Sequence, residues 1–293
     1  MHQVAGNEPV EEALSHDQLQ QAISAIDIPV CPAVVMQAMA EAQKDEPDLS
    51  RLAKLMATDA GMSAAALKLA NSALYRRSGN PISSVRQAVE RLGTKIVVCV
   101  VVATALRSSV HGLPAAWLDK FWRRNMQLAM VSAMVARRQF GIAPDAAYTY
   151  ALFHDAAIPM LMKRFKNYAL VIEAARAKGQ TLVDAEAEHF PCTHPVVGLL
   201  LVRNWQLPAV LGQAIRFHHE PDVYELSDPT LPGGALALIA VTHIAEHLSI
   251  EAQGDRDIEV GPELFRKALA YLGIPDCEVD DLRQQVQAVL EEA

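Results

Sequence analysis

The chain has 293 residues, of which 51% are hydrophobic and 20% charged, so it can bury a sizeable core in one or two domains. A net charge of −8 argues against a nucleic-acid-binding protein, although a local basic patch could still meet an anion. Four widely spaced cysteines without a CxxC pair predict reduced thiols in a cytoplasmic protein, and the acidic N-terminus lacks the pattern of a signal peptide.

The first part of the sequence predicts a polar leader and then a series of short helices. Residues 1–18 are expected to form a flexible leader. The prolines in the segment 28–32 predict an extended backbone there, because proline disfavours helix at the residue before it. Capping residues and apolar spacing predict helices over residues 18–26, 32–43 and 49–58, then a helix capped by Asp59 or Ser63 that reaches Asn71, and finally one over residues 85–92. We expect Gly93 to end the last of these.

A basic loop is expected over residues 75–81. Arg76 and Arg77 within it are candidate contacts for a phosphate or an acidic partner. A solvated surface is the more usual explanation of such a charge run, so both interpretations stay open.

The segment 96–106 is the one apolar run that raises the question of a membrane. Its 11 residues fall well short of the roughly 20 that a spanning helix needs. Its β-branched residues would also suit a strand, but we favour a buried core helix. No membrane association is expected.

The rest of the chain predicts only helices. Their ends are marked by Pro, Gly and capping residues, and their lengths by apolar spacing. The expected ranges are 115–140, a helix from 144 that carries an adjacent His-Asp pair, 168–178, 182–189, 196–205, 209–218, 234–250, 262–272 and 279–292. With no convincing sheet, the predicted fold class is all-α.

The adjacent pair His154-Asp155 is the main chemical candidate. Neighbours on a helix diverge by about 100°, so they cannot easily chelate an ion as an i, i+4 pair can. Pro159 predicts a break in the helix, where both could still contribute to one ion. Because a metal site needs at least three converging ligands, we favour a structural pair in which His154 donates to a backbone carbonyl.

Five stretches in order resemble one known family: residues 28–36, 56–63, 67–75, 82–93 and the pair at 154–155. The chain is similar to the HDOD domain, a non-catalytic-looking branch of the HD metal-dependent phosphohydrolase superfamily found in bacterial signalling proteins. This resemblance implies two packed helical subdomains within residues 19–225, divided into 19–112 and 113–225. Residues 226–293 would be a helical extension that completes the second subdomain.

The resemblance also implies a site. Active relatives in the superfamily place a His on an earlier helix, where this chain has Arg124, and a later Asp where it has His243. An arginine cannot ligate a metal. The extra histidines of the phosphodiesterase branch correspond to His194, His218 and His219.

Six residues are therefore candidate metal ligands: His154, Asp155, His194, His218, His219 and His243. If they converge, they would hold divalent iron, manganese or zinc, and if they do not, no cofactor is expected. The alternative is that the histidines cap helix C-termini. His243 and His247 are spaced to chelate along a helix, although we expect an exposed pair.

Two functions follow from the resemblance. The favoured one is a non-catalytic regulatory module that binds signalling proteins, and the alternative is a metal-dependent phosphohydrolase acting on a nucleotide or cyclic nucleotide. No P-loop, GxSxG, GxGxxG or HExxH motif supports another enzyme class. The position of Arg124 distinguishes these two functions. In the regulatory module it would pair with Asp155, and in the enzyme it would point away from the metal ligands.

Overall fold

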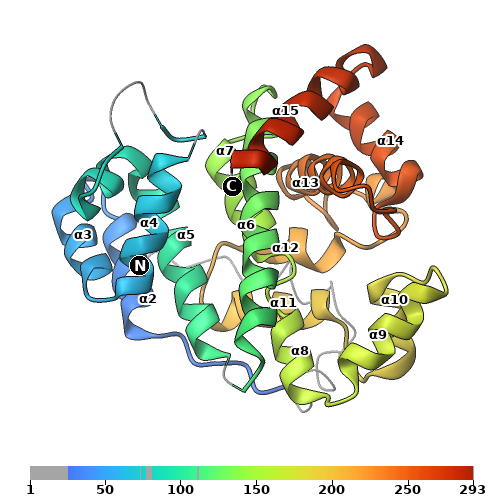
Figure 1. Ribbon diagram of the computed structural model, residues 1–293, viewed down its shortest axis with the longest axis horizontal. Coiled ribbons are helices and arrows are strands. Elements are labelled where there is room, and N and C mark those ends of the chain that lie inside the picture. Colours follow the sequence, from blue (N-terminus) through green and yellow to red (C-terminus); the bar gives the residue numbers. More distant parts are fainter. Residues whose placement is uncertain (1–25, 73, 77–80, 111, 293) are drawn as a thin grey trace.

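The computed structural model describes residues 26–292 except 73, 77–80 and 111. The predicted leader, most of the helix expected over 18–26, and Arg77 therefore lie outside the described residues. Within the described part the chain forms helices and no strand, so the all-α prediction is confirmed. Figure 1 shows α2, α3 and α4 gathered beside α5 at one side, the long α6 in the centre, and α9, α10, α13 and α14 at the other side.

The helices fall into two sets. In the first, α2 (Ala33–Ala42), α3 (Leu49–Ala57) and α4 (Ala60–Asn71) each pack against α5 (Val85–Ser109). The remaining α-helices are α6 (Ala115–Arg137), α7 (Pro144–Phe153), α8 (Ile158–Arg164), α9 (Tyr168–Ala177), α10 (Leu182–His189), α11 (His194–Asn204), α12 (Ala209–Phe217), α13 (Gly233–Ala252), α14 (Gly261–Leu272) and α15 (Val279–Glu292). Short 3₁₀ turns, η2 (Val223–Glu225) and η3 (Asp276–Glu278), complete the described elements. Contacts between α5 and α7 join the two sets.

Local sequence explains how the first set begins and bends. Asp48 caps α3 by accepting the N–H groups of Ser50 and Arg51, and Asp59 caps α4 by accepting that of Met62. The expected break at Gly93 lies inside α5, where this glycine has φ 76°. The apolar run after it is helical and largely buried, as predicted for a core helix.

Helix α13 lies in the core of the second set. It is the only helix among the described residues that is long and apolar enough to cross a membrane. However, 72% of its apolar window is buried inside the protein, against α6, α12, α14 and α15. It is therefore better explained as a core helix than as a membrane span.

The chain turns sharply after α7. Residues 154–157 form a hydrogen-bonded turn, and α8 begins at Ile158 with Pro159 in its first turn. The backbone N–H of Ile158 donates to the carbonyl of Asp155 at 2.9 Å. The break predicted from Pro159 is thus present, and it frees Asp155 from the helical register.

Glycines allow α11 and α12 to approach closely. A Cβ on Gly198 would lie 2.6 Å from Ile215 Cγ2, and one on Gly212 would lie 2.9 Å from Leu199 Cδ1. Only glycine fits these contacts without movement of the neighbouring helix. The close approach brings the first residue of α11, His194, beside the C-cap of α12, His218.

This packing can be tested by adding a single methyl group. We expect Gly198→Ala to lower the free energy of unfolding by about 1–3 kcal/mol, because the methyl group overfills the helix contact. Urea denaturation measures the change. Gly234→Ala is the matched control, since its Cβ would meet nothing closer than 3.9 Å and alanine favours helix. Equal stability of Gly198→Ala and the native chain would contradict the packing argument.

Candidate metal centre

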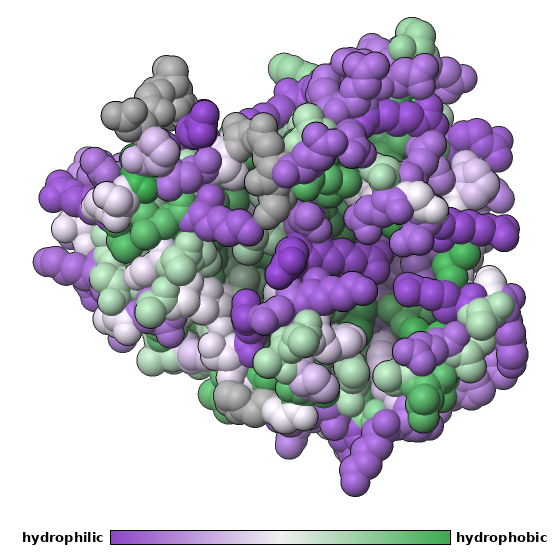
Figure 2. Space-filling model, viewed as in Figure 1, coloured by the Kyte–Doolittle hydropathy of each residue, from purple (hydrophilic) through white to green (hydrophobic). Residues whose placement is uncertain are grey.

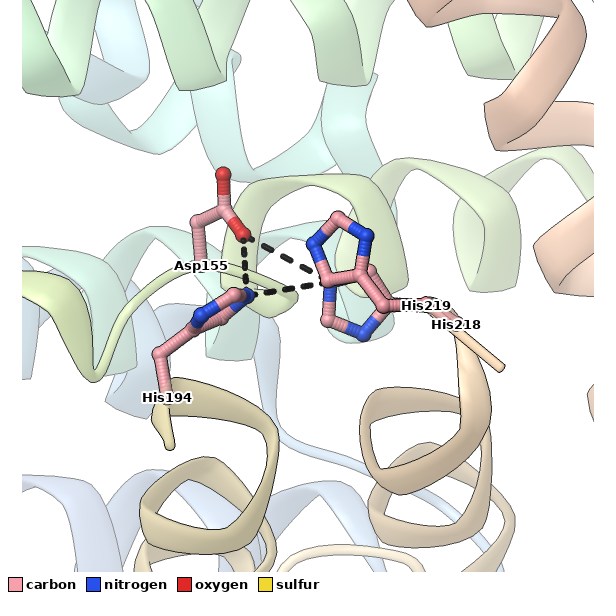
Figure 3. A group of neighbouring side chains, drawn as sticks. All are labelled: Asp155, His194, His218 and His219. Atoms are coloured by element: carbon pink, nitrogen blue, oxygen red, sulfur yellow. Dashed lines mark hydrogen bonds and ion pairs between the residues drawn. The ribbon is translucent and has the colours of Figure 1, made fainter. Parts of the chain in front are cut away.

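Four side chains from three segments converge on one point (Figure 3). Asp155 comes from the turn after α7, His194 begins α11, and His218 and His219 follow α12. One potential ligand atom from each lies within 4.8 Å of all the others. Chain segments that are far apart in sequence therefore supply one group of metal-capable atoms.

Three of these atoms are in close contact. Nε2 of His194 lies 3.3 Å from Asp155 Oδ1, and Nε2 of His218 lies 3.6 Å from the same oxygen. The two Nε2 atoms are 3.4 Å apart. Both imidazoles are buried, whereas the Asp155 side chain retains 17% exposure.

Outer contacts fix which ring nitrogens face inward. Nδ1 of His194 donates to Glu186 Oε2 at 2.7 Å, and Nδ1 of His218 donates to the carbonyl of Ile215 at 2.7 Å. Each ring therefore turns Nε2 towards Asp155. Metal-ligating histidines show this arrangement, in which the second nitrogen is held by a carboxylate or a backbone carbonyl.

The inward-facing atoms are short of hydrogen-bond donors. The buried Oδ1 of Asp155 accepts no hydrogen bond of good geometry, and its contacts with Nε2 of His194 and His218, at 3.3 and 3.6 Å, are attractive only where an imidazole is protonated. Two neutral imidazoles with Nδ1–H would also bring two Nε2 lone pairs together at 3.4 Å, which is repulsive unless a proton or a cation lies near them. The donor set, one carboxylate oxygen and imidazole nitrogens, suits divalent zinc, iron or manganese. The residues present thus fit a metal ion.

The pKa values of the four side chains are consistent with a cation bound between them. Burial opposes a charge on His194, but the carboxylates of Glu186 and Asp155 raise the pKa of His194 to about 10. Burial lowers the pKa of His218 to about 4 and also holds the pKa of His219 below its usual value. Burial alone would raise the pKa of Asp155, yet His154 and the facing histidines hold it well below its usual range. With its pKa raised, a protonated His194 would place the hydrogen of Nε2 where a cation would bind.

His154 does not join the group of four. Its Nδ1 donates to the carbonyl of Ala151 at 2.8 Å, and its Nε2 lies 3.2 Å from Asp155 Oδ2. This is the geometry expected of a structural pair. His154 therefore orients the second oxygen of Asp155 and leaves Oδ1 facing the histidines.

His243 also has a structural position. Its Nε2 donates to the carbonyl of His218 at 2.8 Å, and its Nδ1 accepts from Tyr224 at 2.9 Å. Both ring nitrogens are thus occupied. The expectation of an exposed His243–His247 pair is wrong for His243, which is only 3% exposed, while His247 pairs with Asp257 at 2.7 Å.

Arg124 does not fill the space between the ligands. Its guanidinium lies 3.2 Å from Glu246 Oε1, so the Arg124–Asp155 pair expected of a metal-free centre is not formed. The other basic candidate, Arg76, is exposed, and its role as an anion or partner contact stays a prediction.

A pocket of about 420 Å³ opens beside the cluster, and Asp155 and His219 form part of its wall. It lies between α6, α9 and α13, on the face that Figure 2 shows hollowed and rich in hydrophilic side chains. Its lining carries the basic residues Lys120, Arg124 and Arg176 and the acidic residues Asp155, Glu173, Glu246 and Glu259. The metal-capable side chains of Asp155 and His219 can therefore be reached from solvent through a pocket of mixed charge.

Sequence reasoning missed Glu186, which is fully buried. Besides His194 Nδ1, its carboxylate accepts the backbone N–H of His194 at 2.7 Å and the hydroxyl of Tyr168. The available signal was its position between two alanines, eight residues before His194. Nothing in the sequence shows that this acid, rather than its exposed neighbours, turns inward.

The structure so far defines an all-α protein of two packed helical sets with a His/Asp cluster between helices. The HDOD domain profile matches residues 28–221, and the chain belongs to the HDOD family. This confirms the resemblance drawn from the sequence motifs. No protein with a curated description is similar enough in sequence to be matched.

Solved structures share the fold. An HDOD domain protein of unknown function from Geobacter sulfurreducens is 21% identical, with a TM-score of 0.65 over 93% of this chain and 98% of its own. A protein from Shewanella amazonensis, provisionally named a phosphohydrolase, is 21% identical, with a TM-score of 0.69 over 94% and 95%. One from Marinobacter aquaeolei, provisionally named a signal transduction protein, is 18% identical, with a TM-score of 0.70 over 99% and 66%.

The role of Glu186 gives a test of the centre. We expect Glu186→Gln to weaken binding of Zn²⁺ by about 10–100-fold, because the amide no longer provides a charged acceptor that orients His194. Isothermal titration of metal-stripped protein measures the affinity. Glu188→Gln, an exposed position on the same helix, is the control and should bind like the native chain. Equal affinities for both variants would show that Glu186 does not support a metal ligand.

Proposed function

We propose that this chain is a regulatory signal-transduction module whose conformation depends on one divalent metal ion held by Asp155, His194, His218 and His219. The observation that carries the proposal is the convergence of these four side chains, with inward-facing nitrogens and an unbonded carboxylate oxygen. The name of the Marinobacter aquaeolei neighbour, a provisional signal transduction protein, agrees with such a role.

The positions of the ligands support a conformational role. They come from the turn after α7, the start of α11 and the end of α12, so one ion would tie three segments together. The carbonyl of His218 also accepts from His243 of α13, which extends the connection to the core helix. Loading the site would therefore stabilise one arrangement of helices, and a partner that recognises this arrangement would respond to metal.

The expected partners are signalling proteins in the bacterial cytoplasm. The net charge of −8 disfavours nucleic acid as a partner. The burial of α13 removes the one described helix that would suit a membrane. Recognition would then involve the outer helical surfaces rather than turnover of a substrate.

A metal-dependent phosphohydrolase is the second candidate, and the pocket favours it. Lys120 and Arg176 line that pocket beside Asp155 and are the groups that would bind a phosphate, in competition with the carboxylates of Glu173, Glu246 and Glu259 in the same lining. A bound ion would polarise a phosphoryl oxygen and acidify water there.

One observation favours the module over this enzyme. Only one group of metal-capable side chains converges among the described residues, so a two-metal hydrolysis lacks a second site there. The position of Arg124 agrees instead with the enzyme, because its guanidinium pairs with Glu246 and not with Asp155.

Metal analysis combined with an activity assay tests the proposal. Protein purified without a metal-affinity tag should contain close to one equivalent of iron, manganese or zinc by mass spectrometry, and His194→Ala should lose it because one buried ligand is gone. His189→Ala, an exposed histidine on α10, is the control and should keep the metal.

Hydrolysis of bis(p-nitrophenyl) phosphate and of cyclic nucleotides should be no faster for the native chain than for His194→Ala. Protein that stays free of metal after dialysis against these ions would refute the metal-dependent module. Metal-dependent turnover that His194→Ala abolishes would establish the hydrolase instead.

A further inference from the structure

A second cavity, of about 340 Å³, lies where the two sets of helices meet. Side chains of α2 and α5 line one side, and side chains of α7, α12 and α13 line the other. None of the four metal-capable residues borders it. Its volume falls within the roughly 300–1,000 Å³ of small-molecule sites, which often lie at such junctions.

The walls of this junction cavity are mainly hydrocarbon. The apolar side chains that form most of its surface are Met39, Val98, Val102, Phe153, Leu211 and Leu238. The cavity opens to solvent beside Lys95, so its walls are hydrocarbon surface that a ligand could remove from water.

The charged groups at the cavity neutralise each other. Lys95 Nζ lies 3.2 Å from Asp145 Oδ2, and these two are the charged residues of the lining. The Lys95 side chain is 79% exposed, so the pair faces solvent. A charged ligand would have to compete with this existing pair and would gain little net attraction.

The polar groups inside are also satisfied. The hydroxyl of Thr149 donates to the carbonyl of Asp145 at 2.6 Å and lies 2.6 Å from the thiol of Cys99. Burial raises the pKa of Cys99 to about 12, so the thiol is neutral. Thr149 and Cys99 thus offer neither charge nor a free hydrogen-bonding group to a ligand, and the other uncharged polar side chain of the lining is the exposed amide of Gln43.

From the apolar walls, the neutral ion pair and the satisfied polar groups, we infer that the junction cavity is a binding site for an uncharged, largely apolar small molecule. Such a ligand gains by removing hydrocarbon surface from water on both sides. It would contact Phe153, which directly precedes the His-Asp turn, and Leu211 of α12, the helix directly before His218. Its occupant therefore touches both helices that lead into the metal centre.

Fluorescence titration with N-phenyl-1-naphthylamine, an uncharged aromatic probe, tests this inference on the full chain. The native protein should show saturable binding. Ala146→Phe, which fills the cavity from α7, should weaken it at least about tenfold. Leu170→Phe is the control, because Leu170 is 70% exposed on α9 away from the cavity, and it should bind like the native chain.

Val98→Phe fills the same space from α5 and serves if Ala146→Phe does not fold by circular dichroism. The anionic analogue 1-anilinonaphthalene-8-sulfonate should bind more weakly than the uncharged probe. Three results would refute the site. They are non-saturable binding to the native chain, native affinity in both Ala146→Phe and Val98→Phe, and tighter binding of the anionic probe than of the uncharged one. Dimers of the native chain that Ala146→Phe dissociates, without probe binding, would show instead that a second copy fills the cavity.

Discussion

The metal centre depends on the hydrogen bonds that the buried carboxylate of Glu186 accepts. They come from His194 Nδ1, from the backbone N–H of His194 and from Tyr168. A fully buried carboxylate is costly unless such donors surround it. Here those donors also fix the start of α11 and the orientation of its first imidazole. The same interaction thus satisfies a buried charge and aims Nε2 of His194 at Asp155.

The other ligands are positioned by the fold in a similar way. Gly198 and Gly212 let α11 and α12 approach closely, which sets the distance between His194 and His218. The turn after α7 presents Asp155 to both histidines. Because three segments must be in place together, the centre is sensitive to the arrangement of the helices, and metal binding would favour that arrangement in return.

Much of the fold was predictable from local sequence. The predicted helices at Leu182–His189 and Val279–Glu292 have the observed bounds. The side chain of Thr181 caps the first of them by accepting the backbone N–H of Asp184. The helix expected over 115–140 ends earlier, at Arg137, and Phe140, the apolar residue at which the predicted helix ended, is exposed beyond it.

The site was only partly predictable, because the sequence does not show which atoms are already engaged. The resemblance proposed six ligands, and the structure brings four of them together. His154 and His243 are also imidazoles, but their ring nitrogens already contact neighbouring protein atoms. Arg124 pairs with Glu246, a partner 122 residues away that no local pattern indicates. These outcomes depend on tertiary contacts rather than on residue type.

The central claim is that Asp155, His194, His218 and His219 hold one metal ion. Anomalous X-ray diffraction from crystals grown with Zn²⁺ tests it most directly. The account predicts a single strong peak about 2.0–2.2 Å from one ligand atom each of Asp155, His194, His218 and His219. A map without a peak at this point, with Asp155 instead paired to Arg124, would contradict it.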